Sequence, residues 1–131
     1  MTFVDTSAFF AAADRDDEHH AEAARLLSLA LERDEPLLTH AYVLSETTAL
    51  IHRRLGHSVA RRFLDSVDRF RVVWIDDEIH ARAAARFAKR SPADLSLVDC
   101  ASFVVMDGLG VRACIAFDRH FSDQGYTSFA P

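Results

Sequence analysis

The stretch Phe3-Val4-Asp5-Thr6-Ser7-Ala8 joins a short apolar run to the start of a helix. Its first two residues favour a buried strand, and the three that follow are residue types that cap helices. The same order, an apolar strand followed by an acid, recurs at Cys114-Ile115-Ala116-Phe117-Asp118. In an open parallel sheet, ligands bind beyond the carboxyl ends of the strands. These two stretches therefore predict an α/β fold with a polar site at that edge.

Apolar spacing predicts strands and helices that alternate along the whole chain. The predicted strands span 2–5, 37–39, 71–75, 111–117 and 126–129. The predicted helices span 6–13, 18–33, 41–55, 58–67, 76–89 and 97–109, and Ser91-Pro92 is expected to end the helix before it. Trp74 lies in a predicted strand and is expected in the core. Such alternation is typical of a parallel sheet with helices on both faces.

Length and composition indicate a single domain over residues 1–131, with a net charge of −5. The acidic balance argues against a broad basic surface for nucleic acid. No apolar run approaches the roughly 20 residues that span a bilayer, and the N-terminus lacks a basic region followed by an apolar one. We therefore expect a cytoplasmic protein without membrane contact. Cys100 and Cys114 are expected to be buried free thiols.

Four carboxylates stand where apolar residues are expected. Asp5 and Asp118 end strands, whereas Glu46 and Asp99 lie inside predicted apolar helical stripes. A carboxylate on a buried face is costly unless it is paired or binds a cation. Because all four fall near the same edge of the predicted sheet, they are candidate ligands of a divalent metal and candidate catalytic residues.

Each acid also has a simpler explanation when it is taken alone. Asp5 suits a helix N-cap, Asp118 a turn and Asp99 the first turn of a helix, where the dipole favours an acid. Glu46 could lie at the edge of its stripe and reach solvent. Taken together, the four acids favour a site, and an all-oxygen set suits Mg²⁺, with Mn²⁺ as a possible substitute.

Several neighbouring residues are candidates for supporting roles. Thr6 or Ser7 could hold Asp5 by hydrogen bonds, and Asp94 could be a further ligand or a cap. The histidines show no metal-binding spacing and are interpreted as surface or packing residues, although His120 lies close to the proposed site. A basic stretch with no acidic residue between its members could contact RNA phosphates or form a solvated helix face; it comprises His52, Arg53, Arg54, His57, Arg61 and Arg62.

Over nearly its full length the chain resembles PIN-domain ribonucleases, specifically toxins of the VapC type from toxin–antitoxin pairs. The resemblance rests on four features in order: residues 3–8, Glu46 in the helix after the second strand, residues 95–103 (Leu-Ser-Leu-Val-Asp-Cys-Ala-Ser-Phe), and residues 116–121 (Ala-Phe-Asp-Arg-His-Phe). It implies a three-layer α/β/α PIN fold around a central, mostly parallel sheet of four to five strands. It also implies that Asp5, Glu46, Asp99 and Asp118 form the acidic quartet, with Ser7 supporting the first acid.

The resemblance further implies what such a protein does. It implies a metal-dependent endoribonuclease that cuts tRNA or ribosomal RNA and inhibits translation, with a metal-bound water attacking the phosphodiester. The implied partners are a cognate VapB-type antitoxin and a second copy of the chain, in a homodimer that joins a larger toxin–antitoxin assembly. DNA would be contacted only through the antitoxin. A catalytically silent PIN-like binding module is the alternative, although such modules usually lack one of the four acids.

Overall fold

The computed structural model describes residues 1–89 and 94–130 of the chain. The strands are β1 Thr2–Val4, β2 Leu37–His40, β3 Arg71–Val73, β4 Ala113–Ile115 and β5 Thr127–Ser128. The helices are α1 Thr6–Ala13, α2 His20–Glu32, α3 Ala41–Leu55, α4 His57–Ser66, η1 Val67–Arg69, α5 Asp77–Ala88, α6 Leu97–Leu109 and α7 Arg119–Asp123. The expected alternation of strands and helices is confirmed.

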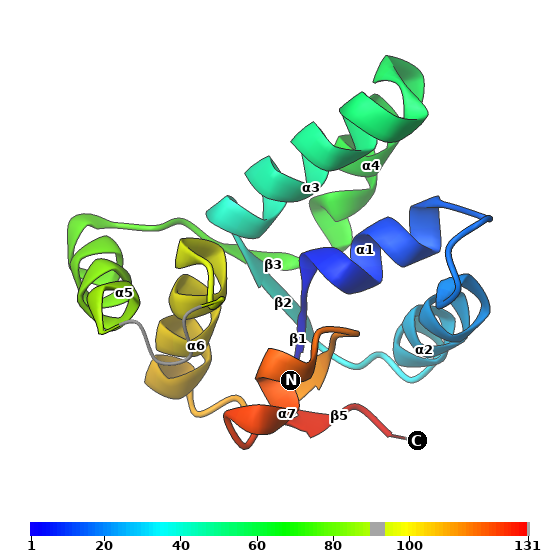
Figure 1. Ribbon diagram of the computed structural model, residues 1–131. Helices are drawn as coiled ribbons and strands as arrows, with labels where there is room; N and C mark the ends of the chain where they lie inside the picture. Colours follow the sequence, from blue (N-terminus) through cyan, green and yellow to red (C-terminus); the bar gives the residue numbers. More distant parts are fainter. Residues whose placement is uncertain (90–93, 131) are drawn as a thin grey trace.

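The strands form one five-stranded sheet in the order β3-β2-β1-β4-β5, and every neighbouring pair is parallel. Helices α5 and α6 lie on one side of the sheet and α1 and α2 lie on the other, while the α3–α4 hairpin extends away from it (Figure 1). The predicted three-layer PIN-like α/β/α class is confirmed. Since all strands run the same way, their carboxyl ends share one edge.

Local chemistry explains where the principal helices begin and end. Asp5 caps α1 by accepting the backbone N–H of Ser7, and Ser96 and Asp99 form a capping box at the start of α6. Helix α3 ends at Gly56, whose φ of 96° is a conformation that side chains rarely adopt. Helices α1 and α6 therefore each begin at a polar side chain that accepts a backbone N–H of the first turn.

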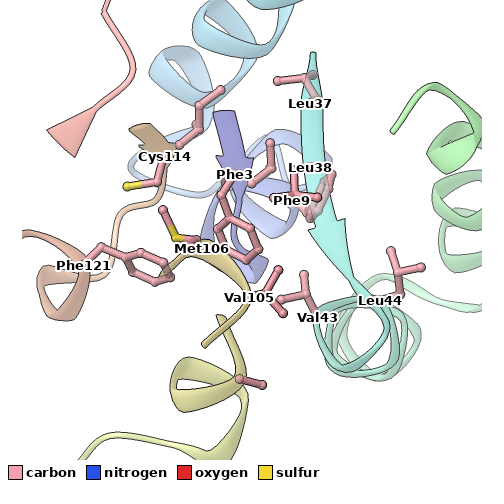
Figure 2. Close-up of a cluster of buried hydrophobic side chains, with 14 of the residues drawn as sticks. Phe3, Phe9, Leu37, Leu38, Val43, Leu44, Val105, Met106, Cys114 and Phe121 are labelled. Carbon is pink, nitrogen blue, oxygen red and sulfur yellow. The ribbon is translucent and has the colours of Figure 1, made fainter. Parts of the chain in front are cut away.

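The core lies between the sheet and its helices. Phe3 from β1 is fully buried and stacks on Phe121 of α7, with ring centroids 5.9 Å apart. Figure 2 shows Met106 of α6 and Val43 of α3 in the same cluster. Cys100 and Cys114 are buried free thiols, as predicted. Burial of aromatic and aliphatic side chains supplies the main driving force for this packing.

Three features differ from the sequence-based expectations. Trp74 follows β3 and is 74% exposed, so its predicted place in the core is wrong. Residues 119–123, for which no helix was predicted, form the short helix α7, and Asp118 caps it by accepting the His120 N–H. The predicted break at Ser91-Pro92 lies outside the described residues. In the described part of the chain, no helix has the length and apolar character needed to cross a membrane.

His40 is a buried histidine that links β2, α3 and α6. Its Nδ1 accepts the backbone N–H groups of Tyr42 and Val43, at 3.2 and 3.3 Å. Its Nε2 lies 2.8 Å from Ser102 Oγ, which itself donates to the Val98 carbonyl at 3.0 Å. Nε2 therefore carries the proton and donates to Ser102. This neutral tautomer completes the network, and burial lowers the pKa of His40 to about 4.

His40 should make the fold sensitive to acid. The unfolded imidazole takes up a proton below its ordinary pKa of 6.5, whereas the folded one stays neutral down to about pH 4, so stability falls as the pH drops through this window. Between pH 7 and pH 5 the wild-type protein should lose about 2 kcal/mol more than His40→Gln in urea unfolding. The exposed control His57→Gln should keep the wild-type profile. Parallel profiles for wild type and His40→Gln would contradict the assignment.

Candidate functional site

Asp5 is held at the end of β1 by Ser7. Its Oδ2 accepts the Ser7 backbone N–H at 3.1 Å and the Ser7 hydroxyl at 2.7 Å. The same hydroxyl oxygen accepts the backbone N–H of Phe117 at 2.9 Å. Only 4% of Asp5 is exposed. The structure thus places Ser7 in the contact that its sequence position suggested, between Asp5 and the segment that leads to Asp118.

Thr6 connects the same corner of the structure to α3 through its side chain. Its Oγ1 accepts a hydrogen bond from the hydroxyl of Thr47 at 3.1 Å, and both side chains are buried. The start of α1, next to Asp5, is therefore joined to the first half of α3 by the hydrogen bond between Thr6 and Thr47. This contact brings the residue that precedes Thr47, Glu46, to the neighbourhood of the carboxyl edge.

A second group of ligand atoms lies where α6 and α7 begin. Asp99, Asp118 and His120 each offer one ligand atom, and these atoms lie within 4.8 Å of one another. Asp99 Oδ2 accepts the Ser96 N–H at 3.1 Å, and Asp118 Oδ1 accepts the His120 N–H at 2.9 Å. Each of these bonds engages one carboxylate oxygen. The other oxygens remain available to a cation, which suits the hard oxygen donors that Mg²⁺ prefers.

The buried acids are electrostatically coupled. Burial raises the pKa of Asp5 to about 6, the Ser7 hydrogen bonds oppose this shift, and the charge of Asp99 adds to it. Burial also raises the pKa of Asp99, with a further contribution from the charge of Asp118. Carboxyl groups whose ionised forms are disfavoured in this way gain most from a bound cation. The charge of Asp99 thus acts on Asp5, and the charge of Asp118 acts on Asp99. A group of carboxylates that interact in this way suits a divalent metal ion.

Glu46 differs from the expectation in its burial. The prediction that it shares the buried stripe of α3 is wrong, because Glu46 and Ala49 are exposed, while Val43, Leu44, Thr47 and Ile51 are buried. Alanine has little apolar area and did not define the buried face. Glu46 lies outside the cluster formed by Asp99, Asp118 and His120, and it presents its carboxylate to solvent one residue from the Thr47–Thr6 contact.

His120 is the residue that the sequence signalled least clearly. Its side chain is 8% exposed, its Nε2 lies 3.3 Å from Asp94 Oδ2 and 3.9 Å from Asp118 Oδ1, and its Nδ1 has no hydrogen-bond partner among the described residues. Asp94 is itself exposed and also lies 3.5 Å from Arg119 Nη2. The only indication of His120 in the sequence was its position two residues after Asp118, a residue that could cap a helix. Asp94 thus contacts His120 and lies beside the cluster.

Comparisons with known proteins show the family and the fold of the chain. The PIN domain profile matches residues 2–125. The 23S rRNA-specific endonuclease VapC20 from two strains of Mycobacterium tuberculosis is 32% identical over 133 aligned residues, which cover 100% of this chain and 99% of the relative. The crystal structure of Mycobacterium tuberculosis VapC20, a sarcin-ricin loop cleaving toxin, superposes with a TM-score of 0.89 at 29% identity and covers 100% of both chains.

Burial of Asp5 should destabilise the metal-free fold at neutral pH. The pKa of Asp5 is about 6 in the folded protein and 3.8 in a free aspartate, so ionisation destabilises the fold only above about pH 3.8. This destabilisation grows until the pH passes 6 and is constant at higher pH. With EDTA present, Asp5→Asn should raise the free energy of unfolding at pH 8 by about 1–3 kcal/mol, because an amide oxygen still accepts from Ser7. Urea unfolding measures this change.

The matched control is Asp16→Asn, an exposed acid in the loop after α1, which should change stability by less than about 0.5 kcal/mol. At pH 4 the gain from Asp5→Asn should shrink to that of the control. A loss of stability at pH 8 would show that the folded protein favours the ionised form of Asp5.

Proposed function

The chain belongs to the PIN-domain family and is a VapC-type toxin endoribonuclease; from this premise we propose that it hydrolyses phosphodiester bonds of ribosomal RNA with a divalent metal. The observation that carries the proposal is the cluster of Asp99, Asp118 and His120, whose ligand atoms lie within 4.8 Å of one another, together with the buried Asp5 at the end of β1. Asp5 and Asp99 are buried, and neither forms an ion pair with a lysine or arginine within residues 1–89 and 94–130, which suits a bound metal better than a structural ion pair.

The substrate follows from the full-length similarity to VapC20. That relative is specific for 23S rRNA, and its solved structure is that of a toxin that cleaves the sarcin-ricin loop. We therefore propose a stem-loop of the large ribosomal RNA as the substrate class here. RNA loops expose unstacked bases and a strand that a nuclease site can reach, whereas duplex regions present mainly shape and phosphates.

Asp5, Asp99 and Asp118 would hold Mg²⁺ or Mn²⁺, with His120 as a nitrogen donor beside them. When bound, the metal would lower the pKa of a coordinated water and stabilise charge on the phosphate and the leaving oxygen. Asp94 would be an outer ligand, because it is exposed and lies between Arg119 and His120. The histidine must be neutral to bind a metal, and Nε2, which faces both Asp94 and Asp118, is the nitrogen that would bind it, so a bound metal would replace the contact between Nε2 and Asp94.

The surrounding residues keep the acids in place. Ser7 fixes the orientation of the Asp5 carboxylate and links it to the backbone before Asp118. The Ser96–Asp99 capping box fixes the third acid at the first turn of α6. Glu46, which reaches solvent, can accept hydrogen bonds from water or from the substrate at the open side of the edge. These contacts hold the acids in place before the substrate binds. Groups that are already in position stabilise a transition state without the free-energy cost of reorganising during the reaction.

We also propose that a VapB-type antitoxin and a second copy of the chain are the protein partners, and that DNA is contacted only through the antitoxin. An apolar groove of about 1010 Å³ supports an antitoxin site. It runs between α1, α2 and α4 and is lined by Phe9, Leu27, Leu31, Leu55, Val59 and Phe63, among others. Grooves of this kind take the apolar face of an amphipathic helix.

Loss of any one of Asp5, Asp99 and Asp118 should remove most of the cleavage activity. Asp5→Asn, Asp99→Asn and Asp118→Asn should each slow cleavage of 23S rRNA by on the order of 100-fold or more, since each removes a metal ligand. Gel analysis of RNA fragments with Mg²⁺, with Mn²⁺ and with EDTA measures the effect, and Glu46→Gln tests the exposed acid. The control Asp16→Asn should cut at the wild-type rate. Full cleavage by Asp5→Asn at saturating Mg²⁺ would refute the metal assignment.

A nitrogen ligand should show in the choice of metal. Imidazole suits Mn²⁺ better than Mg²⁺, which prefers oxygen donors. His120→Ala should therefore lower the ratio of Mn²⁺-supported to Mg²⁺-supported cleavage by roughly threefold or more. Asp94→Asn, which changes the residue beside His120, should leave this ratio closer to wild type. If His120→Ala reduced both rates by the same factor, His120 would serve the substrate or the fold and not the metal.

A further inference from the structure

The α3–α4 hairpin carries a concentration of positive charge that the site does not use. Residues 47–64 contain Arg53, Arg54, Arg61 and Arg62 and no acidic residue, in a chain whose net charge is −5. All four arginines are exposed, and none forms an ion pair within residues 1–89 and 94–130. Figure 1 shows that the tip of this hairpin points away from the sheet.

One face of α3 connects the hairpin tip to the site. Ser45, Glu46, Ala49, His52 and Arg53 are all exposed, and their spacing of three, four and seven residues places them on one side of the helix. The buried residues of α3 lie on its opposite side. Glu46 and Arg53 are therefore about 10 Å apart along the helix axis. The small side chain of Ala49 leaves the space between them open.

The four arginines do not have equal roles. The guanidinium of Arg54 lies 5.5 Å from the centroid of the Phe10 ring, so this residue also packs against α1. Arg62 lines the apolar groove beside α4. Arg53 and Arg61 have neither contact, and they are the pair most available to an anion. His52 and His57, with ring centroids 5.7 Å apart, lie at the same tip.

We propose that the exposed face of α3 and the tip of the α3–α4 hairpin bind the phosphate backbone of the RNA substrate away from the cleavage site. This inference rests on the proposed ribonuclease function and adds where the RNA lies. Guanidinium groups without carboxylate partners are ready to pair with phosphates, and such contacts position an RNA without reading its bases. The hairpin protrudes and its apolar groove faces α1 and α2, which favours RNA over a protein partner at the basic tip.

The test compares RNA binding by Arg53→Gln/Arg61→Gln with that by Arg33→Gln/Arg71→Gln. The control removes the same charge from two exposed arginines at the opposite, amino edge of the sheet. Fluorescence anisotropy with a labelled sarcin-ricin stem-loop RNA, in EDTA and over a series of KCl concentrations, gives Kd and its salt dependence. The hairpin variant should weaken binding on the order of tenfold and reduce the slope of log Kd against log salt by about 1–2.

Further measurements separate this inference from the proposed function. In cleavage assays the hairpin variant should raise KM and leave kcat within about twofold, because Arg53 and Arg61 bind the RNA far from the acids. Arg53→Lys/Arg61→Lys should restore the salt slope. Wild-type protein that cuts no RNA would count against the proposed function. If the hairpin variant and the control had equal Kd values and equal salt slopes, the inference would be wrong while the proposed function would stand. The inference would also be wrong if the hairpin variant bound a co-expressed antitoxin more weakly but bound RNA as the wild type does.

Discussion

Ser7 makes the contact on which the arrangement of the site depends. Its hydroxyl donates to Asp5 and accepts the N–H of Phe117, so one small side chain joins the end of β1 to the segment that follows β4. Because β1 and β4 are parallel neighbours, this link sets where the chain leaves the sheet on both sides of the site. It fixes Asp5 directly and Asp118 through the backbone next to it, and an apolar residue at position 7 would keep only the backbone N–H contact with Asp5 and lose the link to Phe117.

The capping roles of the acids and their proposed metal roles have one structural cause. Helices that follow parallel strands begin at the carboxyl edge, so a residue that caps such a helix already lies where ligands bind. Asp5 and Asp118 cap α1 and α7, and Asp99 belongs to the capping box of α6. The capping bonds engage Oδ2 of Asp5 and Asp99 and Oδ1 of Asp118, which leaves a second oxygen on each. A cap and a ligand are therefore compatible here.

The sequence predicted the long elements well, because apolar spacing and capping residues agree in them. The bounds of α1, α3 and α6 match the predicted ranges 6–13, 41–55 and 97–109. Short or weakly patterned features were less predictable: α7 spans only Arg119–Asp123, and Trp74 sits beyond the last paired residue of an edge strand. Glu46 was placed on the wrong face because Ala49 carries little information about burial. His120 lacked a recognised ligand spacing, because only Asp118 lies near it in the sequence and Asp99, the other member of the cluster, comes from another part of the chain.

The acids of the site and the arginines of the hairpin lie in different parts of the structure, which explains how a protein with a negative net charge can bind RNA. The carboxylates at the sheet edge repel phosphates, and the ionised acids repel one another until a cation is bound. Arg53 lies about 10 Å along the helix axis from Glu46, which is more than the roughly 8 Å over which salt at physiological strength leaves exposed charges unscreened, so its attraction to phosphate is little reduced by that acid. Attraction at the tip can thus act whether or not a metal is present. Approach of the scissile phosphate to the acids, in contrast, requires their charge to be neutralised first, which couples metal binding to productive binding of RNA.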